Sequence, residues 1–311
     1  MTFIQCEKVV KRYDDLISVD HLSFKVDKHE IFGLLGPNGA GKSSAIKMIC
    51  GLLKIDQGQI FVDGISVNSN PIEVKKRLGL VPQELAIYEN LSARENILFF
   101  GKLYGLRGKD LKKKVDEALQ FVGLTERQNE RPEKFSGGMK RRLNIACAIV
   151  HQPKLIIMDE PTVGIDPQSR NHILESVKKL NEMGSTIIYT SHYMEEIETI
   201  CTRVGIIDSG RLIALGSVQE LKDQNKQDEK ITLNVDHIPS EVILELDAHP
   251  HTKEVTATEQ SIEIFINSSQ IYLQDIFFIL SKHDVKIQTL KREEPNLESL
   301  FLSLTGRTLR D

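Results

Sequence analysis

Polar and apolar residues alternate at the start of the chain, and short continuous apolar runs follow. The alternation covers residues 3–13 and 19–26, which are rich in β-formers and are separated by Asp14 and Asp15. This pattern predicts two antiparallel strands. Residues 30–36 form a nearly continuous apolar run ending in glycine, which is typical of a buried strand. The chain is therefore expected to open with an antiparallel pair and to continue into a buried sheet.

Strands and helices alternate through the middle of the chain. Further strands are predicted at 58–64, 154–160 and 185–192, and an amphipathic helix is predicted between the last two, ending at Gly184. Such alternation indicates a parallel sheet with helices on its faces. The stretch at about 86–150 has a helical pattern, so we expect it to form an inserted helical subdomain.

Two features of the sequence support helices in this inserted stretch. Ser92 is followed three residues later by Glu95, which is the spacing of a capping box at a helix start. A second helix is indicated by apolar residues that recur at helical spacing. These residues are Leu111, Val115, Ala118, Leu119 and Val122.

A different pattern begins near residue 231. Its predicted order is strand, helix, strand, strand, helix and strand, which fits a split β-α-β unit of ferredoxin type. These elements are placed at 231–235, 239–246, 253–258, 262–266, 270–282 and 285–291. The charge also changes here, since residues 220–311 carry a net charge of −7 and the preceding residues +3. We therefore predict a first domain at 1–222, a linker at 223–230 and a small α+β domain at 231–311.

Composition narrows the classes of partner. The 311 residues carry a net charge of −4, which argues against a nucleic-acid partner bound by bulk charge. The four cysteines are far apart and show no paired spacing, so neither a metal site nor a disulfide framework is expected. No stretch approaches the roughly 18 apolar residues of a membrane span, and the start lacks the apolar run of a signal peptide. We expect a soluble, cytoplasmic protein that reaches a membrane only through a partner.

A phosphate-binding loop follows the predicted strand at 30–36. Gly36, Gly41, Lys42 and Ser43 fit the pattern G-x-x-x-x-G-K-[ST] between a strand and a helix. The glycines let the backbone approach phosphates closely, and backbone N–H groups with the helix N-terminus face the negative charge. Lys42 can reach the β- and γ-phosphates, and the Ser43 hydroxyl can ligate magnesium. The alternative is a glycine turn that ends a strand, but the strand–loop–helix context favours nucleotide binding. The whole loop comprises Gly36, Pro37, Asn38, Gly39, Ala40, Gly41, Lys42, Ser43 and Ser44.

An acidic pair, Asp159 and Glu160, ends the apolar strand "KLIIM". Neighbouring side chains of a strand point to opposite faces, so the two carboxylates can do different work. One can hold magnesium, usually through water, and the other can orient or deprotonate an attacking water. An isolated acidic pair would more often be a solvated edge or a helix cap. Together with the phosphate loop, the pair predicts a nucleotide hydrolase.

Seven motifs in this order resemble the ATP-binding subunit of an ATP-binding-cassette (ABC) transporter. They cover residues 1–220 and read "KRYDDLISVDHLSF", "GPNGAGKSS", "VPQE", "FSGGM", "LIIMDEP", "GIDP" and "YTSH". The resemblance implies a P-loop NTPase cassette with an antiparallel β subdomain and the helical insert, followed by the small α+β, ferredoxin-like domain. It also implies ATP and Mg²⁺ as cofactors.

The segment "FSGGM" is a second candidate phosphate cradle. It offers backbone N–H donors and a helix N-terminus, but no lysine to grip a nucleotide by itself. The resemblance implies that Ser136, Gly137 and Gly138 cap the γ-phosphate of an ATP held by a facing subunit, in a head-to-tail dimer of identical or paired cassettes. The alternative is an ordinary helix cap by Ser136. Met139 departs from the glutamine frequent in the family, and we expect it to tune the site without abolishing it.

Five further roles are implied by the resemblance. Tyr13 resembles the aromatic residue that stacks on adenine, although packing is the alternative. Gln83 resembles the glutamine that contacts magnesium and the attacking water, and Glu160 resembles the catalytic carboxylate. His192 resembles the histidine at the γ-phosphate, and Asp166 resembles a contact to the opposite chain. The implied magnesium ligands are Ser43, Gln83 and Asp159.

The resemblance also implies a membrane partner. Residues 84–104 are rich in apolar and aromatic residues and correspond to a family groove that receives a separate permease subunit; an ordinary subdomain core is the alternative. The ending "LESLFLSLTGRTLRD" resembles that of bacterial exporter subunits, so the chain is expected on the inner face of the cell membrane. The main alternative is a soluble cassette ATPase in translation or DNA maintenance. The single cassette and the lack of a long heptad run argue against it. A regulatory module without turnover is a second alternative, which the intact Lys42, acidic pair and His192 disfavour.

Overall fold

The computed structural model describes residues 1–224, 229–258, 260–266, 269–293 and 296–306. Contacts divide this chain into two compact units, each considered separately below. One unit contains Met1–Glu220 and residues 304–306, and the other contains Leu221–Ser303. The sequence predicted that the first domain ends at residue 222 and that a linker follows at 223–230. No helix among the described residues is long and apolar enough to cross a bilayer.

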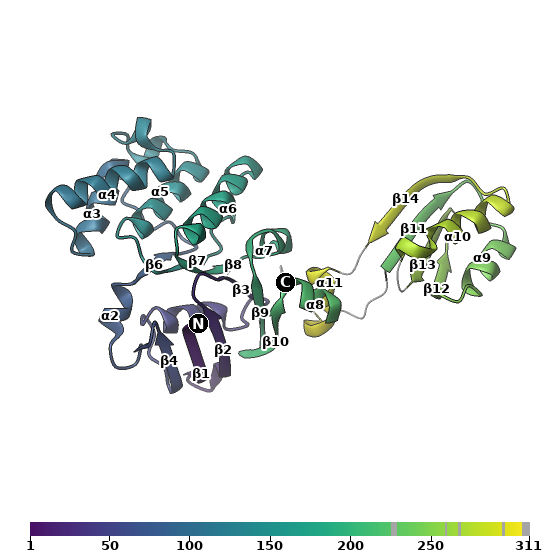
Figure 1. The fold of residues 1–311 in the computed structure, drawn as a ribbon, viewed down its shortest axis with the longest axis horizontal. Helices are drawn as coiled ribbons and strands as arrows, with labels where there is room; N and C mark the ends of the chain where they lie inside the picture. The colour runs from purple at the N-terminus through teal and green to yellow at the C-terminus, as the bar shows by residue number, and fades with distance from the viewer. Residues whose placement is uncertain (225–228, 259, 267–268, 294–295, 307–311) are drawn as a thin grey trace. The chain divides into compact units, whose positions relative to one another are not determined.

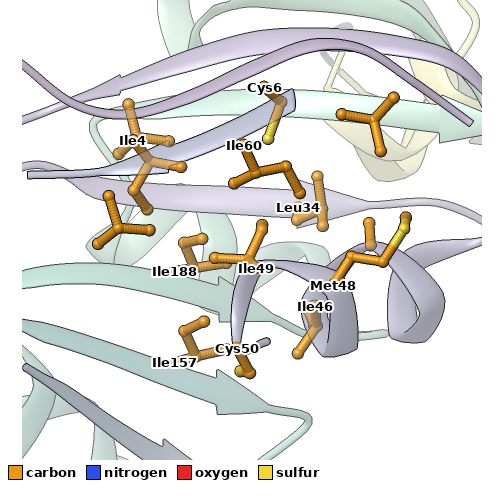
Figure 2. Packing of buried hydrophobic residues seen from close by; sticks show 14 of the residues in the cluster. Ile4, Cys6, Leu34, Ile46, Met48, Ile49, Cys50, Ile60, Ile157 and Ile188 are labelled. Atoms are coloured by element: carbon orange, nitrogen blue, oxygen red, sulfur yellow. The ribbon is translucent and has the colours of Figure 1, made fainter. Parts of the chain in front are cut away.

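An antiparallel sheet of order β2-β1-β4-β5 opens the first unit. Its strands are β1 (Thr2–Tyr13), β2 (Leu16–Asp27), β4 (Gln57–Val62) and β5 (Ile65–Ser66). The predicted antiparallel pair is thus confirmed, because β1 and β2 pair along most of their length. Figure 2 shows Ile4, Cys6 and Ile60 of this sheet packing towards helix α1 (Lys42–Ile49). The sheet therefore holds α1, and with it the start of the phosphate loop's helix, through one hydrophobic core.

A six-stranded sheet of order β10-β9-β3-β8-β7-β6 forms the centre of the same unit. All neighbours from β9 to β6 are parallel, and β10 adds an antiparallel edge. The strands are β3 (Ile31–Leu35), β6 (Leu78–Val81), β7 (Leu155–Asp159), β8 (Thr186–Thr190), β9 (Arg203–Asp208) and β10 (Arg211–Ser217). The predicted parallel sheet is confirmed, and β3 and β8 are buried throughout. The sequence patterns did not predict β6, β9 and β10.

Helices of this unit cover the sheet and build the inserted subdomain (Figure 1). The insert contains α3 (Ala93–Leu103), α4 (Gly108–Phe121), α5 (Gly137–Ile149) and two 3₁₀ turns at Thr125–Arg127 and Pro132–Lys134. The predicted capping box is present, since the Ser92 hydroxyl accepts from the Glu95 N–H at 3.2 Å and the Glu95 carboxylate accepts from the Ser92 N–H at 2.8 Å. The remaining helices are α2 (Pro71–Lys75), α6 (Pro167–Glu182) and α7 (Met194–Ile200), and α8 (Val218–Gln224) crosses the division after Glu220.

The second unit is a split β-α-β fold, as predicted. Its antiparallel sheet has the order β12-β13-β11-β14. The elements are β11 (Glu229–Val235), α9 (Ser240–Asp247), β12 (Thr252–Ala257), β13 (Ser261–Ile266), α10 (Ser269–Lys282) and β14 (Ile287–Glu293). Helix α11 (Leu297–Thr305) crosses the division after Ser303. Alternating residues such as Ile231, Leu233, Ile262 and Ile264 face one side of the sheet and form its core with α9 and α10.

His151 supplies a pH-dependent contribution to the stability of the first unit. Its ring stacks on Tyr104 with centroids 3.5 Å apart, and its Nε2 lies 3.2 Å from the Leu78 carbonyl oxygen. Burial lowers the pKa of His151 from 6.5 to about 4. As the pH is lowered, His151 in the unfolded chain therefore takes up a proton near pH 6.5, whereas in the folded chain it does so only near pH 4. The free energy of unfolding decreases as the pH is lowered through this window.

We expect His151→Phe to remove this acid sensitivity. Between pH 7 and 4.5 the wild type should lose about 2 kcal/mol more of its unfolding free energy than the variant does. Urea unfolding at a series of pH values measures the difference. Exposed His172→Gln is the matched control and should keep the wild-type slope. Identical slopes for wild type and His151→Phe would show that His151 does not carry the effect.

Candidate functional site

Three parallel strands of the central sheet, β3, β7 and β8, have their carboxyl ends at the same edge of the sheet. The phosphate loop follows β3, the acidic pair ends β7, and His192 follows β8. Because parallel strands end at the same edge, these segments meet there. A cavity of about 220 Å³ lies at this edge, and its lining includes residues 38–44, Gln83, Glu160 and His192.

At one position of the phosphate loop, the backbone conformation and the close packing require glycine. Gly41 has a φ of +99°, and a Cβ placed on it would lie 2.3 Å from the Ser18 carbonyl oxygen. The loop turns directly into α1, whose first residue is Lys42. The Lys42 ammonium donates to the carbonyl oxygens of Gly36 at 2.6 Å and Pro37 at 3.0 Å. The lysine is thereby held along its own loop, at the cavity.

Burial sets the electrostatics of Lys42. Desolvation lowers the pKa of its ammonium, while the carboxylates of Glu160 and Asp159 act in the opposite direction. A buried cation with a lowered pKa is stabilised by added negative charge. The loop thus combines backbone N–H groups, a helix N-terminus and a buried cation, which is the chemistry of phosphate binding.

Thr190 holds both members of the acidic pair. Its hydroxyl donates to Asp159 at 2.8 Å and accepts from the Glu160 N–H at 2.9 Å. Glu160 has a φ of +48°, a left-handed conformation that costs a non-glycine residue on the order of 1 kcal/mol. Burial raises the pKa of Asp159, the nearby Glu160 adds to this, and the Thr190 hydrogen bond opposes it. The backbone therefore turns sharply after β7, and Glu160 lines the cavity.

Glu160 and His192 meet across the cavity. The His192 Nε2 lies 2.5 Å from the Glu160 Oε1. The other ring nitrogen, Nδ1, is buried and makes no hydrogen bond to any described residue. A carboxylate and an imidazole in contact beside a phosphate loop can orient a water molecule, and the carboxylate oxygen of Glu160 can accept a proton from it.

The predicted magnesium ligands fit a magnesium ion bound together with phosphates. Ser43 and Gln83 line the cavity, and Asp159 lies close enough to Lys42 to influence its pKa. Magnesium takes hard oxygen ligands and keeps several waters, so one carboxylate, one hydroxyl and one amide oxygen suffice when phosphates supply the rest. The described residues contain no cluster of three or more His, Cys, Asp or Glu side chains that would enclose a metal alone.

Comparison with known proteins decides the family. The model of the ABC transporter family matches residues 19–163. The linearmycin resistance ATP-binding protein LnrL of Bacillus subtilis (strain 168) is 48% identical over 310 residues, which are 99% of this chain and 100% of that protein. The chain belongs to the ABC transporter family. It is an ATP-binding subunit, and ATP hydrolysis is the activity of such cassettes.

Other relatives agree with this assignment. The Nod factor export ATP-binding protein I of Sinorhizobium fredii is 37% identical over 317 residues, covering 99% of this chain and 87% of that protein. A solved structure titled as the ATP binding subunit of an ABC transporter has a TM-score of 0.66 and 29% identity, covering 71% of this chain and 92% of that one. These findings confirm the predicted fold class, and they give the translation or DNA alternative no support.

The segment predicted to be a second phosphate cradle is not part of the cavity lining. Ser136 caps α5 by accepting from the Met139 N–H at 3.2 Å, and Asp166 caps α6 by accepting from the Ser169 N–H at 2.9 Å. The cap predicted for Ser136 is therefore present. A Cβ on Gly138 would lie 2.2 Å from the Ser169 hydroxyl, so the starts of α5 and α6 pack closely. Neither Ser136, Gly138 nor Asp166 lines the cavity.

Tyr13 also lies outside the cavity lining. It is the last residue of β1, its side chain is 44% exposed, and the Lys11 ammonium lies 5.4 Å from its ring centroid. The ring is accessible for stacking, and its contact with adenine stays a prediction.

Two residues of the site were missed from the sequence. Ser18 lines the cavity and shares a hydrogen bond of 2.9 Å with Ser44, yet nothing marks it except its place in the stretch after Tyr13. Arg141 is buried, and its guanidinium donates to the carbonyl oxygens of Pro82 at 2.7 Å and Gln83 at 2.6 Å. In the sequence it is the middle one of three consecutive cations at 140–142, and nothing marks it as buried. Arg141 ties α5 to the segment that carries Gln83.

Proposed function

We propose that this chain is the ATP-hydrolysing subunit of an exporter that works as a head-to-tail pair of cassettes around two ATP molecules. The pair drives efflux through a separate permease and lies on the cytoplasmic face of the membrane. The names of three relatives support export: linearmycin resistance, Nod factor export, and the probable multidrug protein YbhF of Escherichia coli, which is 38% identical over 229 residues. YbhF is longer, since the match covers 39% of it and 74% of this chain.

The separation of the two phosphate-binding segments carries the proposal. The cavity gathers Lys42, Glu160 and His192, whereas Ser136 and Gly138 lie outside its lining. The segment at the start of α5, residues 135–139, contains no lysine or arginine of its own. A second copy of the chain, related by a twofold axis, would bring its α5 N-terminus to this cavity and receive the same in return.

Each residue in the cavity has a proposed role in phosphoryl transfer. The backbone N–H groups of residues 38–44 and the ammonium of Lys42 hold the β- and γ-phosphates of ATP. Mg²⁺ on Ser43, Gln83 and Asp159 would neutralise developing charge on the phosphates. Glu160 orients the attacking water and accepts its proton, a role worth about a hundred- to ten-thousand-fold in rate. His192 positions the γ-phosphate, and Tyr13 stacks on adenine.

The proposed permease contact lies on the helical insert. Residues 84–104 leave Leu85, Tyr88, Phe99 and Leu103 exposed by 41%, 46%, 36% and 66%. The rings of Tyr88 and Phe99 meet edge to face with centroids 4.9 Å apart. Such a group of exposed apolar side chains suits a short apolar helix of a membrane subunit. The closing of the cassette pair on ATP would then shift the permease between two states.

Mixing two differently impaired chains tests the head-to-tail arrangement. Lys42→Met disables one chain's loop and keeps its α5 N-terminus. Gly137→Glu places a repelling charge at the other segment. The fold should tolerate this change, because Gly137 is exposed and only Ile165 would lie within 4 Å of an added Cβ, at 3.8 Å. Each variant alone should be inactive. An equal mixture should recover about a quarter of the wild-type ATPase activity, since half of the pairs contain one intact composite site.

The double variant Lys42→Met/Gly137→Glu is the matched control. In a head-to-tail pair with wild type, both composite sites are broken, so an excess of the double variant should suppress wild-type hydrolysis. If each chain used its own two segments, the mixture would stay inactive and the double variant would leave wild-type activity unchanged. Either result would refute the arrangement.

A further inference from the structure

Glu196 is a buried carboxylate with an unusual number of partners. It lies in α7, and only 2% of it is exposed. One of its oxygens, Oε2, accepts hydrogen bonds from the hydroxyls of Thr162 at 2.9 Å, Tyr189 at 2.9 Å and Ser191 at 2.6 Å. A buried carboxylate needs such donors, because an unpaired charge in the interior costs several kcal/mol.

The three donors come from the segments that carry the candidate catalytic pair. Thr162 lies two residues after Glu160, and Ser191 immediately precedes His192. Tyr189 stands in β8, the strand that leads to His192, and burial raises the pKa of its hydroxyl so that it stays a donor. Glu196 therefore joins the backbone after β7 to the backbone after β8.

A fourth partner connects this cluster to α6. The Arg170 Nε lies 3.4 Å from the second oxygen of Glu196, an ion pair in which neither atom makes a hydrogen bond to any described residue. The Arg170 guanidinium stacks 4.1 Å above the ring of Tyr193. Tyr193 directly follows His192, so the residues on both sides of the histidine are held. Arg170 lies in the first turn of α6, where its N–H donates to the carbonyl oxygen of Asp166 at 2.9 Å. The segment proposed to contact the second chain is thereby linked to the segment of His192.

We propose that Glu196 is a positioning residue that aligns Glu160 with His192 and couples this pair to the start of α6. Glu196 does not line the cavity. It fixes Thr162 and Ser191, which set the direction of the two neighbouring catalytic side chains, and it holds Arg170 where Asp166 begins the helix. The inference rests on the proposed roles of Glu160, His192 and Asp166. When two cassettes close against Asp166, this contact then acts on the alignment of Glu160 with His192. The effect passes through α6, Arg170 and Glu196.

Glu196→Gln in the full-length chain tests the proposal. The amide keeps the size and one acceptor oxygen but turns an N–H₂ group towards Arg170, so the ion pair is lost. We expect kcat for ATP hydrolysis to fall about ten- to a hundred-fold, as for a small misplacement of reacting groups. The KM for ATP and the thermal midpoint should stay close to wild type. A role in stability alone would instead lower the midpoint and leave the kcat of the folded fraction unchanged.

The neighbouring Glu195 is the matched control, because it lies on the same helix and is exposed. Glu195→Gln should keep the wild-type kcat. A double-mutant cycle with Arg170→Met adds a second readout: if the two side chains act as one unit, the double variant loses less activity than the two single losses multiplied. Independent losses, or an unchanged kcat in Glu196→Gln, would overturn the proposal.

A conservative variant keeps the test decisive if Glu196→Gln fails to fold. Thr162→Val removes one hydroxyl donor and preserves the shape of the side chain. It should lower kcat with the midpoint retained, and an unchanged kcat overturns the inference. Glu160→Gln is assayed in parallel. If Glu160→Gln still hydrolyses ATP, the proposed function of the cavity fails; if it is inactive while Glu196→Gln and Thr162→Val are fully active, only the positioning role fails.

Discussion

Glu160→Gln is expected to leave ATP binding intact and to nearly abolish ATP turnover. Glu160 lines the cavity, and its Oε1 lies 2.5 Å from the His192 Nε2. Glutamine has the same size but cannot accept the proton of an attacking water, so the loss should be about a hundred- to ten-thousand-fold in rate. Because ATP stays bound and uncleaved, the closed cassette pair should accumulate.

Steady-state phosphate release and size-exclusion chromatography with ATP measure the two effects. The wild type should form the pair transiently, and the Glu160→Gln variant should elute as a stable pair. Glu175→Gln, an exposed carboxylate on α6, is the control and should behave like wild type. Hydrolysis at the wild-type rate in Glu160→Gln would remove Glu160 from its proposed role.

Lys42→Met should weaken ATP binding by about ten- to a hundred-fold, since a hydrogen bond to a charged group contributes roughly 1.5–3 kcal/mol. Lys42 is buried at the start of α1, and methionine matches its length without its charge. The backbone N–H groups of residues 38–44 remain and should retain some affinity for the phosphates.

Equilibrium titration with a fluorescent ATP analogue measures this loss. Lys47→Met is the matched control, because Lys47 lies on the same helix and is exposed. Its affinity should stay within about twofold of wild type, the range of most exposed substitutions. An unchanged affinity in Lys42→Met would mean that the lysine does not contact the phosphates.

The sequence by itself determined the local elements and the residue types of the site. A continuous apolar run followed by Gly36–Ser44 defines a strand, a loop and a helix start, because burial, glycine freedom and helix capping all act within a few residues. The same holds for the capping box at Ser92 and for the order of elements in the second unit. The acidic pair at the end of β7 was visible for the same reason.

The tertiary structure decided which residues meet. Strand β8 pairs with β7, which places His192 beside Glu160. It also pairs with β3, more than 150 residues earlier in the chain, and this pairing brings the phosphate loop to both residues. Ser18, Arg141 and Glu196 carry no local signature, because their partners are set by packing between distant segments. The Arg141 bond to Gln83 spans 58 residues, and the Thr162 bond to Glu196 spans 34. Hydrophobic patterns record which face of an element is buried, but not which element covers it.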